Sequence, residues 1–171
     1  MNTMFEHALL FVFPAVMFLA AASDLASMTI PNRLSLALVT GFAVLAVLVG
    51  MPFETALWHL GAAAATLAVG FVLFAFGWMG GGDAKLAAAT ALWLGFALLP
   101  DYIAVTAIIG GVVTIGILIL RRWPLSEAAR GRSWLVRLHD KRNGVPYGVA
   151  LALAALIVFP HSPLPVLALA G

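Results

Sequence analysis

The sequence predicts an all-α membrane protein, a polytopic bundle of six transmembrane helices with both termini extracytoplasmic. Two observations on composition support this class: 64% of the 171 residues are hydrophobic and only 9% are charged. A soluble domain of this size cannot bury so much apolar surface. The third observation is that the apolar residues form stretches long enough to cross a bilayer as helices.

Charged residues, prolines and glycines divide the chain into six apolar segments, of which the second and the fourth are the shortest. They run approximately over His7–Ser23, Leu34–Val49, Thr55–Trp78, Ala84–Leu99, Tyr102–Leu120 and Val145–Ala170. Each can cross roughly 30 Å of hydrocarbon as a helix of about 20 residues, with some tilt or fraying. Their apolarity is continuous, whereas strands of a membrane barrel alternate apolar and polar residues. We therefore expect helices.

Local signals support the first four segments in chain order. Residues 1–23 contain no Lys or Arg, so the first segment lacks the basic region of a signal peptide and is expected to remain as an uncleaved span. Pro31 favours a fresh helix start for the second segment. Gly80–Gly82 break the chain after the third. The fourth must begin at or before Asp83 if it is to cross the bilayer.

The last two segments are bounded in the same way. Pro100 and Asp101 separate the fourth segment from the fifth, and Arg121 ends the fifth. Pro146 lies at the start of the sixth segment, where a proline in the first helical turn is tolerated.

The basic residues predict the orientation of these spans. All nine lie in three connections, at Arg33, at Lys85 and between Arg121 and Arg142. With six spans, those connections share one face of the membrane, and the positive-inside rule makes that face cytoplasmic. The opposite face receives only acids, namely Glu6, Glu54 and Asp101.

No internal repeat or low-complexity linker divides the chain, so residues 1–171 are expected to form a single transmembrane domain. Its one substantial polar segment is a basic cytoplasmic loop at about 121–145, for which a short interfacial helix and a charged loop fit equally well. The loop is most simply a topology determinant, with contact to anionic membrane lipid second. The formal charge of +2 is too small to indicate nucleic-acid binding.

No metal or cofactor is expected. The chain has no cysteine, which excludes disulfides, thiol nucleophiles and cysteine-ligated zinc but identifies no redox compartment. The histidines lie far apart, without the spacing of a metal site; they are His7, His59, His139 and His161.

Asp24 and Asp83 are the candidate functional residues. An ionisable side chain at the edge of an apolar span is costly there and is by default a functional candidate. Between the two acids the chain crosses the membrane twice, once outward and once back. Both acids are therefore expected at the cytoplasmic boundary. Each also has a structural interpretation: Asp24 can simply end a span beside Arg33, and Asp83 can be the N-cap of the helix after Gly80–Gly82. A phosphate cradle at these glycines is discarded, because the full P-loop pattern is absent and the acid would repel phosphate.

Three motifs together resemble the prepilin peptidase family of membrane aspartic proteases. They are Asp24 followed by Ile30-Pro31-Asn32, the G-x-G-D run of Gly80, Gly81, Gly82 and Asp83 with Lys85-Leu86 after it, and Pro146-Tyr147-Gly148 at the last span. The resemblance covers nearly the whole chain. The chain is similar to the minimal form of the enzyme that serves Flp-type (tight-adherence) pili. This form does without the cysteine-containing region that methylates the new pilin N-terminus. A preflagellin-type peptidase is a close relative and stays open as the alternative.

The resemblance implies an aspartic endopeptidase in the bacterial inner membrane, with Asp24 and Asp83 catalytic and the other motif residues shaping the site. Its partner would be a prepilin, either a Flp-type pilin or a pseudopilin, and contact with the pilus assembly machinery is possible. The leader peptide would be cut on the cytoplasmic side, after a glycine that precedes the substrate's hydrophobic helix.

Two carboxyls at hydrogen-bonding distance cannot easily both ionise, so one is expected to keep a proton while the other acts as a base. From the helix ends and from Lys85, we expect Asp83 to be the more readily ionised and Asp24 to hold the proton. Two other functions use the same residues differently. A small proton-coupled transporter or channel would use them as a relay, and an assembly scaffold would use them only as caps and anchors.

Overall fold

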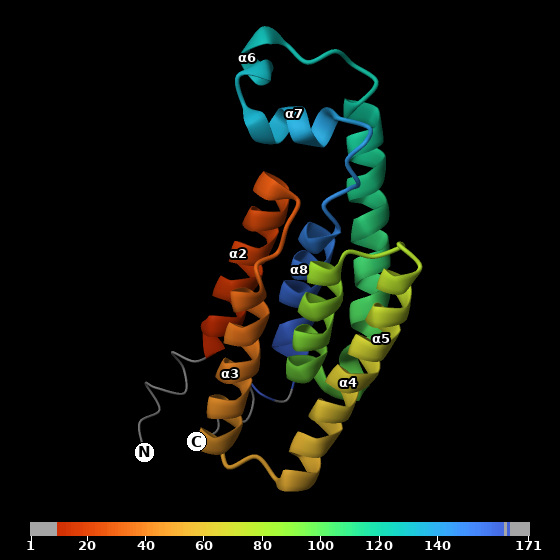
Figure 1. Ribbon diagram of the computed structural model, residues 1–171. Coiled ribbons are helices and arrows are strands. Elements are labelled where there is room, and N and C mark those ends of the chain that lie inside the picture. The colour runs from red at the N-terminus through yellow and green to blue at the C-terminus, as the bar shows by residue number, and fades with distance from the viewer. Residues whose placement is uncertain (1–9, 163, 165–171) are drawn as a thin grey trace.

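The computed structural model describes residues 10–162 and 164, and every regular element within this part of the chain is helical (Figure 1). The helices are α2 (Val12–Ser27), α3 (Asn32–Leu48), α4 (Phe53–Ala75), α5 (Gly81–Leu120), α6 (Glu127–Arg130), α7 (Ser133–His139) and α8 (Tyr147–Val158), followed by the 3₁₀ turn η1 (Phe159–His161). The all-α prediction is therefore confirmed for the described residues. The first predicted segment begins at His7, which lies outside them.

Helix α2 ends later than the sequence indicated. It continues to Ser27, so Asp24 lies inside its last turn and not after it. Met28 then adopts a left-handed conformation with φ 56°, which stops the helix. Pro31, with an extended backbone, becomes the N-cap of α3, as its fixed φ and missing N–H favour.

Helix α5 contains a break that the sequence analysis placed wrongly. Gly95 has φ 70° and ψ 177°, a conformation that is essentially restricted to glycine. At this residue the chain reverses direction, so that α5 descends to Gly95 and then ascends as a second helix (Figure 1). The predicted boundary at Pro100 and Asp101 is therefore wrong. Pro100 lies close to the start of the second helix, where few backbone N–H groups have a helical partner to lose.

The last helix is shorter than predicted. The predicted span was Val145–Ala170, whereas α8 ends at Val158 and passes into the turn η1, which contains Pro160. A proline in this position cannot continue the α-helical hydrogen bonds. Residues 165–170 of that span lie outside the described part.

Aromatic side chains fill the end of the bundle opposite the acids. Trp93 is fully buried and contacts Phe13, Phe42 and Phe159, with ring centroids 5.2, 6.1 and 5.9 Å away. Its indole N–H donates to the carbonyl of Leu38 at 2.9 Å. The packing of this cluster joins α2, α3, α5 and the turn η1 after α8, and so fixes the frame on which the opposite end is built.

Large apolar side chains also cover the outside of the bundle, including Phe18 (69% exposed), Val47 (80%) and Phe71 (65%). Such a surface is costly in water and suits lipid. Helices α4 and α5 are long and apolar enough to cross a membrane, and α2, α3 and α8 are shorter apolar helices.

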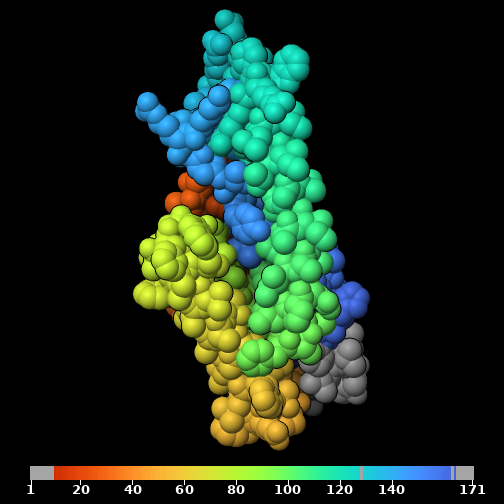
Figure 2. Space-filling model, turned by 90° about the vertical axis from the view of Figure 1, so that its right-hand side faces the viewer, coloured from red at the N-terminus to blue at the C-terminus, as the bar shows by residue number. Residues whose placement is uncertain are grey.

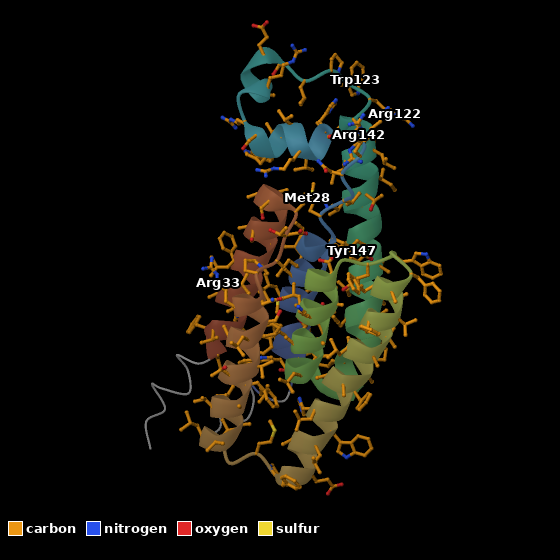
Figure 3. The ribbon with its side chains drawn as sticks, in the orientation of Figure 1. Met28, Arg33, Arg122, Trp123, Arg142 and Tyr147 are labelled. Atoms are coloured by element: carbon orange, nitrogen blue, oxygen red, sulfur yellow. The ribbon has the colours of Figure 1, made fainter. Side chains whose placement is uncertain are left out.

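The basic segment folds as two short helices, α6 and α7, across one end of the bundle (Figure 1). Figure 3 shows Arg122 and Arg142 at the end that carries the basic segment and Arg33 lower, near the middle of the molecule. The guanidinium of Arg121 fixes the stretch of chain that leads from α7 to α8. It donates to the carbonyls of Leu138 (2.7 Å), Asn143 (3.0 Å) and Gly144 (2.9 Å).

Candidate active site

Asp24 and Asp83 line one cavity of about 460 Å³ at the end of the bundle that carries the basic segment. Backbone and small side chains make up most of the remaining wall. The lining residues are Asp24, Met28, Thr29, Ile30, Gly80, Gly81, Gly82, Asp83, Gly144 and Val145. We refer to this space as the acid cavity.

Asp24 reaches the acid cavity from the last turn of α2 and is only 5% exposed. Its Oδ2 makes no hydrogen bond of ordinary geometry, although the backbone N–H groups of Gly148 and Val149 approach the carboxyl from the start of α8. The carboxyl therefore lies near the negative C-terminal end of α2 and near the positive N-terminal end of α8. Helix polarity therefore does not decide which acid holds the proton.

Asp83 lies in the first turn of α5, and the N-cap of this helix is Gly80. The structural interpretation of Asp83 as the N-cap is therefore wrong. Its carboxyl reaches back toward the backbone N–H of Gly80, in the manner of the third helical residue of a capping box. The side chain is half-buried, and Asp24 acts on it electrostatically.

Ile30 packs between the two helix starts that carry Gly82 and Gly148. A Cβ built on Gly82 would lie 3.2 Å from the Ile30 Cβ, and one on Gly148 would lie 2.5 Å from the Ile30 Cδ1 and 2.8 Å from the Asp24 Oδ2. Because both residues are glycines, α5 and α8 can approach the loop between α2 and α3, which contains Ile30. The first and third sequence motifs therefore meet in space at Ile30.

Other predicted residues lie beside the acid cavity without lining it. Lys85 donates to the Asn32 side-chain oxygen at 2.9 Å, so its ammonium fastens α5 to α3. Pro31 and Pro146 are helix N-caps. Tyr147 turns toward α5, where its ring leaves no room for a side chain at Gly110.

The sequence analysis did not select four residues of the wall, Met28, Thr29, Gly144 and Val145. Each immediately follows or precedes a selected motif, and this adjacency was the available signal. Met28 lies at the end of α2 below the basic segment (Figure 3). Among the described residues, no group of three or more His, Cys, Asp or Glu side chains could hold a metal ion.

Two carboxyls around a small polar cavity can share a proton and orient a water molecule. At hydrogen-bonding distance from each other, two such acids favour a state in which one is neutral and donates while the other is charged and accepts. The glycine wall beside Asp83 leaves backbone exposed to a ligand. The arrangement is therefore suited to general acid–base chemistry on an extended chain.

Comparison with known proteins gives a consistent result. The model of the Type IV leader peptidase family matches residues 11–115. The chain is 30% identical over 141 residues to a prepilin leader peptidase/N-methyltransferase of Aeromonas salmonicida strain A449, and 30% identical over 145 residues to one of Aeromonas hydrophila. Each alignment covers 78% of this chain, which spans about 42% of the length of these curated relatives. No solved structure gives a significant match.

Proposed function

The chain belongs to the type IV leader peptidase family, and from this premise we propose that it is a membrane aspartic endopeptidase. Its substrates are prepilins of the type IV or Flp type, from which it removes the leader peptide at the cytoplasmic face of the inner membrane. The observation that carries the proposal is that Asp24 and Asp83 line the same acid cavity, although 58 positions (83 − 24 − 1) separate them in sequence.

In the proposed mechanism the two carboxyls hold one proton between them. The ionised acid takes a proton from a water molecule, whose oxygen attacks the scissile carbonyl carbon, while the neutral acid donates its proton to the carbonyl oxygen. The tetrahedral intermediate collapses when the carbonyl re-forms and the C–N bond breaks. The leaving nitrogen takes a proton from the dyad, and the products are a carboxylic acid and a free amine.

The glycines of the wall support an extended substrate. A protease must present an unwound peptide bond to its acids, and side chains beside Asp83 would hold that bond away. Gly80 and Gly81 lack such side chains, and Gly82 is already in contact with Ile30. We propose that the scissile segment lies along this glycine wall with its carbonyl oxygen toward the acids.

The proposal also includes the placement of the whole chain. Residues 1–171 form one peptidase domain with six spans, both termini outside and the basic segment in the cytoplasm. The positive charge of that segment favours the anionic inner leaflet. Besides prepilin and lipid, the pilus assembly machinery is a proposed partner.

Leader removal during co-expression tests the function. The native chain and its Asp24→Asn, Asp83→Asn and Asp101→Asn variants are each produced with candidate prepilins, and processing is followed by gel shift. We expect the first two variants to leave the precursor uncut and Asp101→Asn, an exposed acid away from the cavity, to process normally. Processing by either dyad variant at the native rate would refute the mechanism, and a proton flux lost without any change in processing would favour a transporter.

A further inference from the structure

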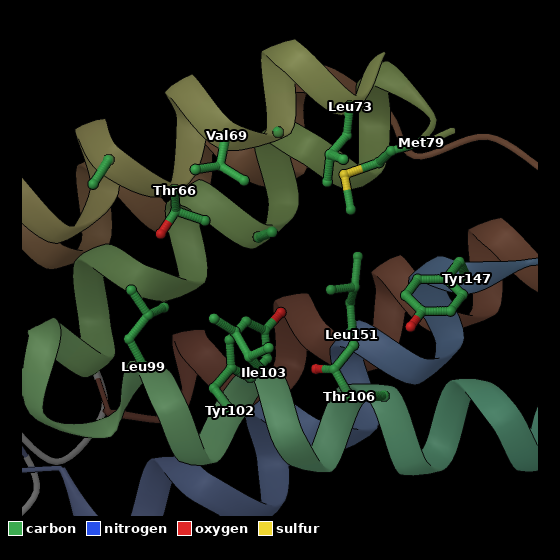
Figure 4. A pocket seen from close by; sticks show the side chains of 14 residues that line it. Thr66, Val69, Leu73, Met79, Leu99, Tyr102, Ile103, Thr106, Tyr147 and Leu151 are labelled. Carbon is green, nitrogen blue, oxygen red and sulfur yellow. The ribbon is translucent and has the colours of Figure 1, made fainter. Parts of the chain in front are cut away.

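A second cavity, of about 320 Å³, lies between α4, the part of α5 after Gly95, and α8. Its wall is almost entirely apolar (Figure 4). Residues that define it include Val69, Leu73, Met79, Ile103, Tyr147 and Leu151. We refer to it as the apolar groove.

The apolar groove adjoins the acid cavity along two stretches of chain. Met79 lines the groove and the next residue, Gly80, lines the acid cavity. On the other side, Val145 lines the acid cavity and Tyr147, two residues later, lines the groove. A peptide that passes over the glycine wall can therefore continue into the groove.

The groove opens sideways from the bundle. Its rim residues Val69 and Ile103 are 60% and 58% exposed. Figure 2 shows the hollow between α4 (yellow) and the second part of α5 (green), with blue atoms of the chain that leads into α8 at its floor. If the bundle spans a membrane, this opening faces lipid, and an apolar helix already in the bilayer can enter without crossing water.

Two buried hydroxyls lie in the wall of the groove. Tyr102 is 2% exposed and Thr106 is 6% exposed. Figure 4 shows both side chains beneath the groove. The Tyr102 hydroxyl has those of Thr90 and Thr106 as its polar neighbours, and both oxygen atoms are buried. The surface that the groove offers to a ligand is therefore apolar.

We propose that the apolar groove holds the start of the substrate's hydrophobic helix, on the carboxyl side of the bond that is cut. The inference rests on the proposed function, because it assigns the groove to the same substrate. Along α4 the wall runs from Leu73 to Ala65, roughly 12 Å at 1.5 Å per residue, which accommodates about two helical turns.

Photocrosslinking tests the occupant directly. A photoreactive phenylalanine derivative replaces Ala107, which lines the groove, or Ala104, an exposed alanine on the same helix outside it. Both are made in the full-length Asp83→Asn chain, in membranes that contain the co-expressed precursor. We expect a covalent adduct with the precursor or its product at 107 and none at 104. Equal crosslinking at the two positions, or an adduct at 107 only with lipid or with a second copy of the chain, would overturn the inference.

Steady-state kinetics on the native background supply the second test. Ala107→Phe fills the groove and should raise KM for the membrane-embedded precursor about tenfold, with kcat little changed, whereas Ala104→Phe should leave both constants at the native values. A native KM in Ala107→Phe would refute the proposed role of the groove and leave the proposed function standing. A native chain that cuts no precursor would refute the proposed function itself.

Discussion

Asp24 fits beside α8 because residue 148 is a glycine and has no Cβ. A Cβ at this position would lie 2.8 Å from the carboxyl oxygen and 2.5 Å from Ile30, both closer than atoms in ordinary contact. Asp24 and Ile30 are both buried, so a side chain at residue 148 would push them toward the acid cavity that they line. The position of the Asp24 carboxyl therefore depends on the absence of a side chain at residue 148.

We predict that Gly148→Ala lowers leader processing about 100-fold, because displacement of a catalytic group by about 1 Å can cost that much. The measurement is the processing rate of purified protein, with its thermal unfolding temperature recorded in parallel. Gly116→Ala is the matched control, since a Cβ there meets nothing within 4 Å. Equal processing by the two alanine variants would contradict the prediction.

The sequence predicted which acids converge but not how they are packed. Asp24, Asp83 and the three glycines before Asp83 could be assigned to one face because charge placement and an even number of crossings follow from the chain itself. The contacts of Gly148 and the turn of Tyr147 toward α5 could not be predicted, because they depend on the distance between helices that are far apart in sequence. Lys85 was expected to act on Asp83, and its hydrogen bond to Asn32 likewise depends on how α3 meets α5.

At the scale of elements, the break in α5 depends on one glycine and one histidine. His59 of α4 forms a hydrogen bond between its Nδ1 and the carbonyl of Leu92 at 2.8 Å, near the end of the descending helix. The imidazole also lies against Gly95, where a Cβ would be 3.2 Å from its Cε1. A proline is the more visible breaker in sequence, which explains why Pro100 and not Gly95 was predicted as the boundary.

Gly95→Ala should lower the free energy of unfolding by about 1–3 kcal/mol, the usual cost of a side chain in such a backbone region, with a further contribution from the contact to His59. Thermal unfolding in detergent measures it. Gly111→Ala, at a helical position with open space around it, should cause no loss. A Gly95→Ala protein as stable as the native chain would show that the break does not require glycine.

The connection between α5 and α8 has its own fixed point in Arg121. Its guanidinium donates to three carbonyls, including that of Gly144, which lines the acid cavity. The planar fork of arginine reaches several acceptors at once, which a lysine ammonium does not reproduce. Arg121 therefore ties the last part of the basic segment, including Gly144 of the cavity wall, to the end of α5.

Arg121→Lys should slow leader processing roughly tenfold through displacement of Gly144, while total charge is kept. Arg122→Lys is the control, because Arg122 is exposed and neighbours it in sequence. Rates are compared at equal amounts of membrane-inserted protein. If both variants process at the native rate, Arg121 does not position the cavity wall.

At the scale of the whole molecule, one end of the bundle carries the basic residues and the acid cavity, and the other carries the aromatic cluster around Trp93. The proposed topology places the first end in the cytoplasm. Hydropathy sufficed to predict that the chain is helical, which the described residues confirm, whereas the number of spans and their direction stay predictions. Hydropathy and charge could not predict the apolar groove, since its walls come from three helices whose apolar residues look alike in sequence.

Introduced cysteines test this topology, since the chain has none of its own. In intact cells, a membrane-impermeant thiol reagent that reaches the periplasm should label Glu54→Cys, at the start of α4. It should label Ser126→Cys, in the basic segment, only after the membrane is opened. The reverse pattern would contradict the orientation.

The central claim is that Asp24 and Asp83 act as one unit, and the kinetics of the double variant test it most directly. Single-turnover processing is measured for Asp24→Asn, Asp83→Asn and the chain with both changes. Because residues of one catalytic unit are strongly non-additive, we predict that the double variant is no slower than the slower single variant. Losses that multiply, or a single variant that processes at the native rate, would contradict a shared role.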